Sequence, residues 1–270
     1  MRRYRLDALE HREGRLYFGG APFDGIAYEV VGDRVVANHL VSDGLRVGPA
    51  EPWDENRDRA VWSALTFVEE DETTKQFPEP GAYLNGVLFE GVAYGFDHTT
   101  GVLLCEEDAR GDAAGPSREW YESGVLRSHS GRVLPDGYTI SESFYRSGLL
   151  RTVEADQLGW GQTADGRLRT LRLYPGYREV DLATAPTQVD TDLLGLTGKG
   201  VTDDVLKRFT GWEDLAKLYL SNTGITAKGL ETLRVCSKLQ ELLIYEGNEF
   251  TDADVQELNT HLPNCRWRKH

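Results

Sequence analysis

The pattern of apolar positions in the last third of the chain repeats every 23 to 24 residues. Because side chains of a strand alternate between its two faces, the last two apolar positions of each copy predict a short strand with one buried face. Repeats of this length bury their apolar faces only against their neighbours, so a stack of similar units is expected. The copies read Leu215-x-x-Leu218-x-Leu220, Leu239-x-x-Leu242-x-Ile244 and Leu262-x-x-Cys265-x-Trp267, preceded by Thr191-x-x-Leu194-x-Leu196.

A helix is predicted after each of the first three strands. Thr202, Thr226 and Thr251 stand where a helix N-cap belongs, and acidic residues follow the first and third of them. The apolar residues that these helices are expected to bury are Val205, Leu206, Phe209, Leu230, Leu233, Val255 and Leu258.

Residues 1–186 carry a different pattern of short alternating runs, rich in glycine and aromatic residues, between Ser-Gly, Asn-Gly and Asp-Gly pairs. Such pairs permit the positive φ angles of tight turns, so a string of β-hairpins is predicted. The stretch from Ala60 to Leu65 fits either a helical turn or a strand. The acidic run Glu69-Glu70-Asp71-Glu72 predicts an exposed loop.

This region also repeats. Phe23-Asp24-Gly25-Ile26-Ala27-Tyr28 recurs 66 residues later as Phe89-Glu90-Gly91-Val92-Ala93-Tyr94, so residues 16–65 and 82–132 are interpreted as two copies of one unit. A shorter repeat relates Trp120-Tyr121-Glu122-Ser123-Gly124-Val125-Leu126 to Phe144-Tyr145-Arg146-Ser147-Gly148-Leu149-Leu150, with Asp165-Gly166-Arg167-Leu168 as a weaker third instance.

Two stretches carry family resemblances. Gly115-Pro116-x-x-x-Trp120-Tyr121-x-x-Gly124-x-Leu126 and Phe23-x-Gly25-x-Ala27-Tyr28 resemble MORN-type repeats, in the variety found in bacterial proteins labelled as antitoxins, over residues 14–175. The resemblance implies hairpin repeats that contact proteins or lipid, and an antitoxin role. Residues 187–270 resemble a short leucine-rich repeat array of the helix-containing type, although its usual asparagine position falls on Thr223 and then on Gly247, beside Asn248.

The predicted fold is therefore β-rich plus α/β, with antiparallel β-hairpin (MORN-like) repeats in residues 1–186 and a small leucine-rich repeat solenoid in residues 187–270. The boundary is expected at Pro186 and Thr187. We expect the first leucine-rich unit to pack on the β-rich region, and Trp267 to cover the last one.

The charge of the chain bears on its partners. The formal net charge is −14, of which residues 187–270, with 10 Lys or Arg and 13 Asp or Glu, carry only −3. An acidic surface repels phosphate backbones and anionic lipid, which disfavours nucleic acid and membrane as partners. It suits a basic protein partner, or it serves only to keep the chain soluble.

Compartment and chemistry follow from what the sequence lacks. The sequence contains no run of 18 apolar residues, and no apolar segment follows the basic N-terminus. The three cysteines are scattered. Together these features favour a cytoplasmic location. No metal, cofactor or nucleophile motif is found; Gly198-Lys199-Gly200 lacks the spacing of a phosphate loop, and the histidines are isolated. A non-catalytic protein without a cofactor is favoured.

The candidate binding residues are the outward positions of the predicted strands. The residues chosen are Thr197, Tyr219, Ser221, Leu243 and Tyr245. A row of two tyrosines and a leucine has the composition of a protein-binding patch. Alternatively, these side chains pack against the β-rich region or simply cover the sheet.

Three functions are compatible with these observations. The first is a protein-binding module, in its sharper form an antitoxin or immunity-type protein that sequesters a basic partner. The second is an architectural protein that assembles with itself through strand edges. The third is a hydrolase whose residues meet only in the folded chain.

Overall fold

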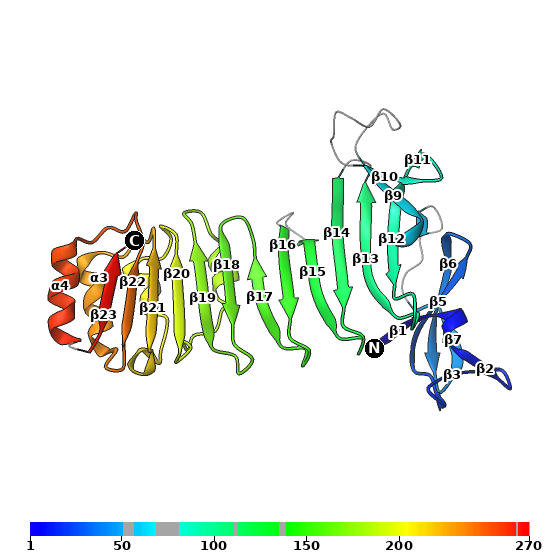
Figure 1. Cartoon of the computed structure of the whole chain (residues 1–270), viewed down its shortest axis with the longest axis horizontal. Coiled ribbons are helices and arrows are strands. Elements are labelled where there is room, and N and C mark those ends of the chain that lie inside the picture. Colours follow the sequence, from blue (N-terminus) through cyan, green and yellow to red (C-terminus); the bar gives the residue numbers. More distant parts are fainter. Residues whose placement is uncertain (51–56, 69–80, 111–112, 135–138, 263, 270) are drawn as a thin grey trace. The chain divides into compact units, whose positions relative to one another are not determined.

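The computed structural model describes residues 1–50, 57–68, 81–110, 113–134, 139–262 and 264–269. The chain is strand-rich, with large mixed sheets and few helices (Figure 1). Its contacts divide it into two compact units. The N-terminal unit is Met1–Gly137 with Arg146–Gly148, and the C-terminal unit is Tyr138–Tyr145 with Leu149–His270. The predicted acidic loop at Glu69 to Glu72 lies outside the described residues.

The N-terminal unit contains a mixed sheet and two small three-stranded antiparallel sheets. The mixed sheet contains β1 (Arg2–Arg5), β5 (Gly25–Val31), β6 (Arg34–Ser42), β7 (Leu45–Gly48), β8 (Asp58–Val61), β12 (Glu90–Phe96), β13 (Leu103–Arg110), β14 (Ala113–Trp120) and β15 (Leu126–Val133). The small sheets are β2 (Glu10–Arg12), β3 (Arg15–Phe18) and β4 (Ala21–Pro22), and β9 (Leu65–Val68), β10 (Gly81–Leu84) and β11 (Val87–Leu88). Two 3₁₀ helices are η1 (Leu6–Ala8) and η2 (Trp62–Ala64).

Two stretches of this unit share one order of elements. Strand β1 pairs in parallel with β5, placing Arg2 opposite Gly25, and β8 pairs in parallel with β12, placing Asp58 opposite Gly91. Each first strand is followed by a 3₁₀ helix and a three-stranded sheet. The first set of matching elements begins at β1, before residue 16, and the second begins at β8, before residue 82. The starts therefore differ from the bounds of 16–65 and 82–132 that the sequence suggested, and β8 falls inside the first of them. The stretch from Ala60 to Leu65 combines a strand end with the η2 turn.

Gly25 and Gly91 occupy matching positions in these two parallel pairings. A Cβ atom on Gly25 would overlap the carbonyl oxygen of Arg2 and the Phe23 ring, and one on Gly91 would overlap the carbonyl oxygen of Asp58 and the Phe89 ring. Both phenylalanines are buried, so neither ring has room to withdraw. The close approach of the strands therefore requires glycine at both positions.

The three recurring Gly-containing segments form hairpin turns of one geometry. The backbone N–H groups of Tyr121, Tyr145 and Thr163 donate to the carbonyls four residues ahead, those of Val125, Leu149 and Arg167. Gly124, Gly148 and Gly166 have φ angles of 79°, 84° and 83°, which glycine adopts at little cost. The weaker third instance seen in the sequence thus has the same turn as the first two.

The C-terminal unit begins with four antiparallel strands and continues with four parallel ones. The antiparallel strands are β16 (Thr139–Phe144), β17 (Leu150–Glu154), β18 (Leu158–Gln162) and β19 (Leu168–Leu173), and the parallel strands are β20 (Leu193–Thr197), β21 (Lys217–Ser221), β22 (Glu241–Ile244) and β23 (Arg266–Lys269). Strand β19 pairs in parallel with β20, so the two sets form one sheet across the predicted boundary at residue 186. That boundary stays a prediction.

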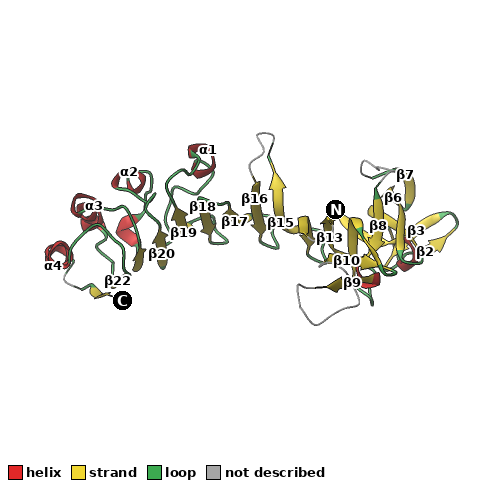
Figure 2. Ribbon diagram, turned by 90° about the horizontal axis from the view of Figure 1, so that it is seen from above, coloured by secondary structure: helices red, strands yellow, loops and turns green. Residues whose placement is uncertain are grey.

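Helices lie along one face of this sheet (Figure 2). They are α1 (Glu179–Leu182), α2 (Asp203–Leu206), α3 (Ala227–Thr232) and α4 (Asp252–His261), with 3₁₀ helices η3 (Trp212–Asp214) and η4 (Leu233–Val235). Thr226 and Thr251 cap their helices through the side chain, but Thr202 does not. Among the described residues, no helix is long and apolar enough to cross a membrane.

The core of the C-terminal unit lies between the strands and the helices. The inward residues predicted from the repeat are at most 4% exposed in β20, β21 and β22: Leu194, Leu196, Leu218, Leu220, Leu242 and Ile244. The seven apolar helix residues chosen from the sequence are buried in the same cluster, and Trp267 packs against its end. Burial of this ladder is the main stabilising interaction of the unit.

The loops after these strands are joined by polar side chains. Lys199 Nζ donates to the carbonyls of Thr223 at 3.1 Å and Gly247 at 2.5 Å, and forms an ion pair with Glu249 at 3.3 Å. The Asn248 carboxamide accepts from the backbone N–H of Thr223 at 2.9 Å and donates to the Tyr245 carbonyl at 2.6 Å. Asn248 therefore satisfies neighbouring backbone groups, one position after the expected asparagine, and Lys199 ties three successive loops together.

We predict that Gly25→Ala and Gly91→Ala each lower the free energy of unfolding by about 2 kcal/mol, because the added methyl group has no space. Urea unfolding followed by circular dichroism measures the effect. Gly195→Ala is the matched control, since a Cβ there would meet nothing closer than 3.8 Å. Equal stability of all three variants would contradict the close approach.

Candidate functional site

The five residues chosen from the sequence gather on one face of the C-terminal sheet, opposite the helices. Tyr219 lies in register between Gly195 and Leu243, and Thr197 lies beside Ser221. Tyr245 continues β22, since its backbone N–H donates to the Leu220 carbonyl at 2.9 Å. We call Thr197, Tyr219, Ser221, Leu243 and Tyr245 the strand-face patch. The first four are half-buried and Tyr245 is 40% exposed.

Alternation along the strands explains this arrangement. Leu218 and Leu220 point into the core, so Tyr219 and Ser221 must point out, and the same holds for Leu243 between two buried neighbours. The patch thus rests on a tightly packed layer that fixes its backbone. A rigid platform with an aromatic and an aliphatic side chain suits protein recognition.

Sequence reasoning missed the cations on the same face. Tyr219 and Leu243 lie in one row across the strands, and Arg268 continues that row on β23. Lys217, Glu241 and Arg266 form the neighbouring row. Lys217 and Glu241 each lie two residues before a patch residue on the same strand, and Arg268 is the register partner of Leu243. The strand alternation that selected the patch therefore also contained this signal. The face therefore carries Tyr219, Leu243 and Arg268 along one row and only charged side chains along the next.

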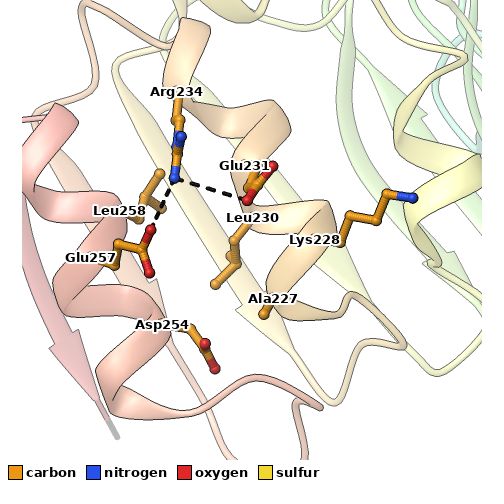
Figure 3. A pocket seen from close by; sticks show the side chains of 8 residues that line it. All are labelled: Ala227, Lys228, Leu230, Glu231, Arg234, Asp254, Glu257 and Leu258. Atoms are coloured by element: carbon orange, nitrogen blue, oxygen red, sulfur yellow. Dashed lines mark hydrogen bonds and ion pairs between the residues drawn. The ribbon is translucent and has the colours of Figure 1, made fainter.

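A second candidate is a small crevice between α3 and α4, with Leu230 and Leu258 in its lining (Figure 3). Arg234 spans it, pairing with Glu257 at 3.2 Å and Glu231 at 4.0 Å. Figure 3 shows Lys228 pointing away from these side chains. Arg234 thus bridges a glutamate of each helix, so the crevice is explained by helix packing.

Asp254 also lines this crevice, but its carboxylate is committed to helix capping. It accepts from the backbone N–H of Thr251 at 2.6 Å and from the Thr251 hydroxyl at 2.7 Å. These hydrogen bonds lower the pKa of Asp254. A carboxylate held in this way is not available as a general acid near neutral pH.

A third candidate is a polar cleft in the N-terminal unit, lined by Arg57, Glu106, Asp108, Arg118 and His129. Arg118 pairs with Glu106 at 2.6 Å, and Arg57 pairs with Asp108. Burial, and then the charges of Arg118 and Arg132, lower the pKa of His129, so its ring is neutral at neutral pH. Because both carboxylates are paired, no group is set apart as an acid or a nucleophile.

Arginines beside this cleft stack on an aromatic ring. The Arg3 guanidinium lies 4.7 Å from the centre of the Trp120 ring, and that of Arg118 lies 5.6 Å from it. Arg3 also donates to the Tyr28 hydroxyl at 2.8 Å. These contacts join β1 to the strands that follow and give the cluster a packing role.

Metal and thiol chemistry find no support in the described part of the chain. No group of three or more His, Cys, Asp or Glu side chains there is placed to hold a metal ion. Burial raises the pKa of Cys236 to about 12 and that of Cys265 to about 11, and it also raises the pKa of Cys105. The nucleophilic thiolate is therefore scarce at all three positions.

Comparisons with known proteins add no family. No protein-family model matches the chain, and no curated protein matches it. A solved structure of accessory secretory proteins 1, 2 and 3 from Streptococcus pneumoniae gives a likeness with 14% identity and a TM-score of 0.17. The match covers 81% of this chain but only 42% of that one. A likeness this low carries no argument about fold or function.

We predict that adjacent residues of β21 respond in opposite ways to substitution. Leu218→Ala removes a fully buried side chain and lowers the free energy of unfolding by about 3 kcal/mol. Tyr219→Ala, on the outward face, changes it by less than about 1 kcal/mol. Urea unfolding of both variants tests the assignment of faces, and a larger loss for Tyr219→Ala would reverse it.

Thiol reactivity gives a separate prediction. In the native chain at pH 8, iodoacetamide should modify Cys236 and Cys265 slowly, because burial keeps both thiols protonated and covered. All three cysteines should react readily in urea, which serves as the control. Mass spectrometry after timed alkylation reports each site, and native rates as fast as those in urea would rule out the buried placement.

Proposed function

We propose that this chain is a non-catalytic protein-binding module that contacts its partner through the strand-face patch. The observation that carries the proposal is the presence of Tyr219 and Leu243 side by side in register, facing away from the core. Aromatic side chains such as Tyr219, facing outward from a fixed backbone, are common anchors of protein interfaces. In keeping with the resemblance of residues 187–270 to leucine-rich repeats, the four parallel strands have helices on one face and present their other face outward. Stacks of such repeats usually bind other macromolecules.

The sharper form of this proposal is an antitoxin or immunity-type role. It rests on the resemblance of residues 14–175 to MORN-type repeats and on the net charge of −14, most of which lies in residues 1–186. A basic partner would be attracted to that acidic part of the chain. In this form the N-terminal unit attracts the partner and the strand-face patch contributes the apolar contacts.

The architectural alternative has less support. Self-assembly through strand edges requires an edge that accepts another strand, and β23 carries Arg266, Arg268 and Lys269 in four residues. Charged side chains of this kind are a common means of preventing edge-to-edge pairing. The hydrolase alternative gains no support from the two clefts described above, because their carboxylates pair with arginines or cap a helix.

Affinity capture from lysate of the source organism tests the proposal. The wild-type chain is expected to retain a protein that a Tyr219→Asp, Tyr245→Asp variant loses at least tenfold, because a buried carboxylate disrupts an apolar interface. Val235→Asp, Gln256→Asp is the matched control, with the same charge change at exposed positions away from the patch.

The three outcomes lead to different conclusions. A protein lost only by the tyrosine variant supports the strand-face patch. A protein lost by both variants indicates a general charge effect, and retention by both moves the contact to another surface. Absence of any specific protein would contradict the binding role.

A further inference from the structure

The outward-facing cations of β21 and β23 are distinguished by forming no ion pair within the described part of the chain. Residues 187–270 contain ten Lys and Arg residues, and six of them form ion pairs with carboxylates: Lys199, Lys207, Arg208, Arg234, Lys238 and Lys269. Within the described part of the chain, Lys217, Arg266 and Arg268 form no ion pair. The remaining residue, Lys228, lies on α3, so three of the four unpaired cations share the strand face.

The register places these cations next to the strand-face patch. Lys217, Glu241 and Arg266 face one another across β21, β22 and β23, and Tyr219, Leu243 and Arg268 form the neighbouring row. Three cations against one carboxylate leave a local charge of +2 on a chain whose net charge is −14. This face is thus opposite in sign to the protein as a whole.

Such a surface selects its partner by charge. A partner segment with carboxylates next to aliphatic side chains would match this face. Its carboxylates would pair with the cations, while its aliphatic side chains would cover Tyr219 and Leu243. A basic segment would be repelled by Lys217, Arg266 and Arg268. Nucleic acid, with its high density of phosphates, would be repelled by the chain as a whole, whose net charge is −14.

We propose that the strand face of the C-terminal unit binds an acidic segment of a partner protein, with carboxylates paired to Lys217, Arg266 and Arg268 and apolar side chains packed on Tyr219 and Leu243. The inference rests on the proposed function and specifies the chemistry of its partner at this face. The attraction of a basic surface by the acidic N-terminal unit is a separate contact and is compatible with it.

A direct binding measurement tests this proposal. A short fluorescein-labelled peptide of alternating Glu and Leu is titrated with the full chain and followed by fluorescence anisotropy, alongside a Lys and Leu peptide of the same length. The Glu–Leu peptide should bind more tightly. Lys217→Gln, Arg268→Gln should weaken it about fivefold, as expected for the loss of two partly exposed ion pairs, and added salt should weaken the wild type towards that level.

The matched control removes the same charge from the helix side. The Lys207→Gln, Lys228→Gln variant removes one cation at the C-terminal end of α2 and one within α3. It should leave the affinity for the peptide unchanged. Circular dichroism verifies that each variant is folded, and Arg266→Gln provides an independent strand-face variant at an exposed position.

The outcomes separate this inference from the proposed function. Tighter binding of the Lys–Leu peptide, or equal losses in the strand-face and helix-side variants, would overturn the acidic-segment proposal. If the Glu–Leu peptide fails to bind while capture of a protein still depends on Tyr219 and Tyr245, the partner chemistry is wrong and the binding role stands. If capture also fails, both are wrong.

Discussion

The C-terminal unit depends on one constraint, which is that alternate residues of each parallel strand must be buried against helices on a single face of the sheet. Leu194, Leu218 and Leu242 face one another in consecutive strands and are almost completely buried. A slip of one residue in any strand would turn its leucines to solvent and bring residues such as Lys217 into the core. The same constraint that stabilises the core therefore determines which side chains are presented outside.

The loops between strands and helices meet a second requirement, which is that their buried backbone N–H and carbonyl groups must find hydrogen-bond partners. Thr223 is fully buried, and its backbone N–H and carbonyl are bound by Asn248 and Lys199. Lys199 follows β20, Thr223 follows β21 and Asn248 follows β22, so these polar contacts tie the loops of successive strands together as the leucines tie the strands. A buried backbone group without a partner would cost about 1–3 kcal/mol, which explains the use of a lysine and an asparagine here.

In the N-terminal unit, the principal device is the close parallel approach of strands distant in sequence. Paired residues of β1 and β5 are 23 positions apart in the sequence, and those of β8 and β12 are 33 positions apart. Glycine at residues 25 and 91 permits this approach, and a phenylalanine packs beneath each glycine. The recurrence of the Phe-x-Gly motif in the sequence is therefore the trace of a repeated tertiary contact, although alternation alone suggested only hairpins.

By itself, the sequence determined the features that depend on local periodicity: the inward leucines, the helix residues that cover them, the Gly-containing hairpin turns and the outward position of the strand-face patch. These follow from the two-residue period of a strand and from the φ angle that glycine allows. Only the tertiary structure decided the parallel pairing of β1 and β8, the ties made by Lys199 and the row of unpaired cations beside Tyr219. Each of these depends on which strands are neighbours and in what register, and such contacts join residues too far apart in the chain for any local pattern to specify.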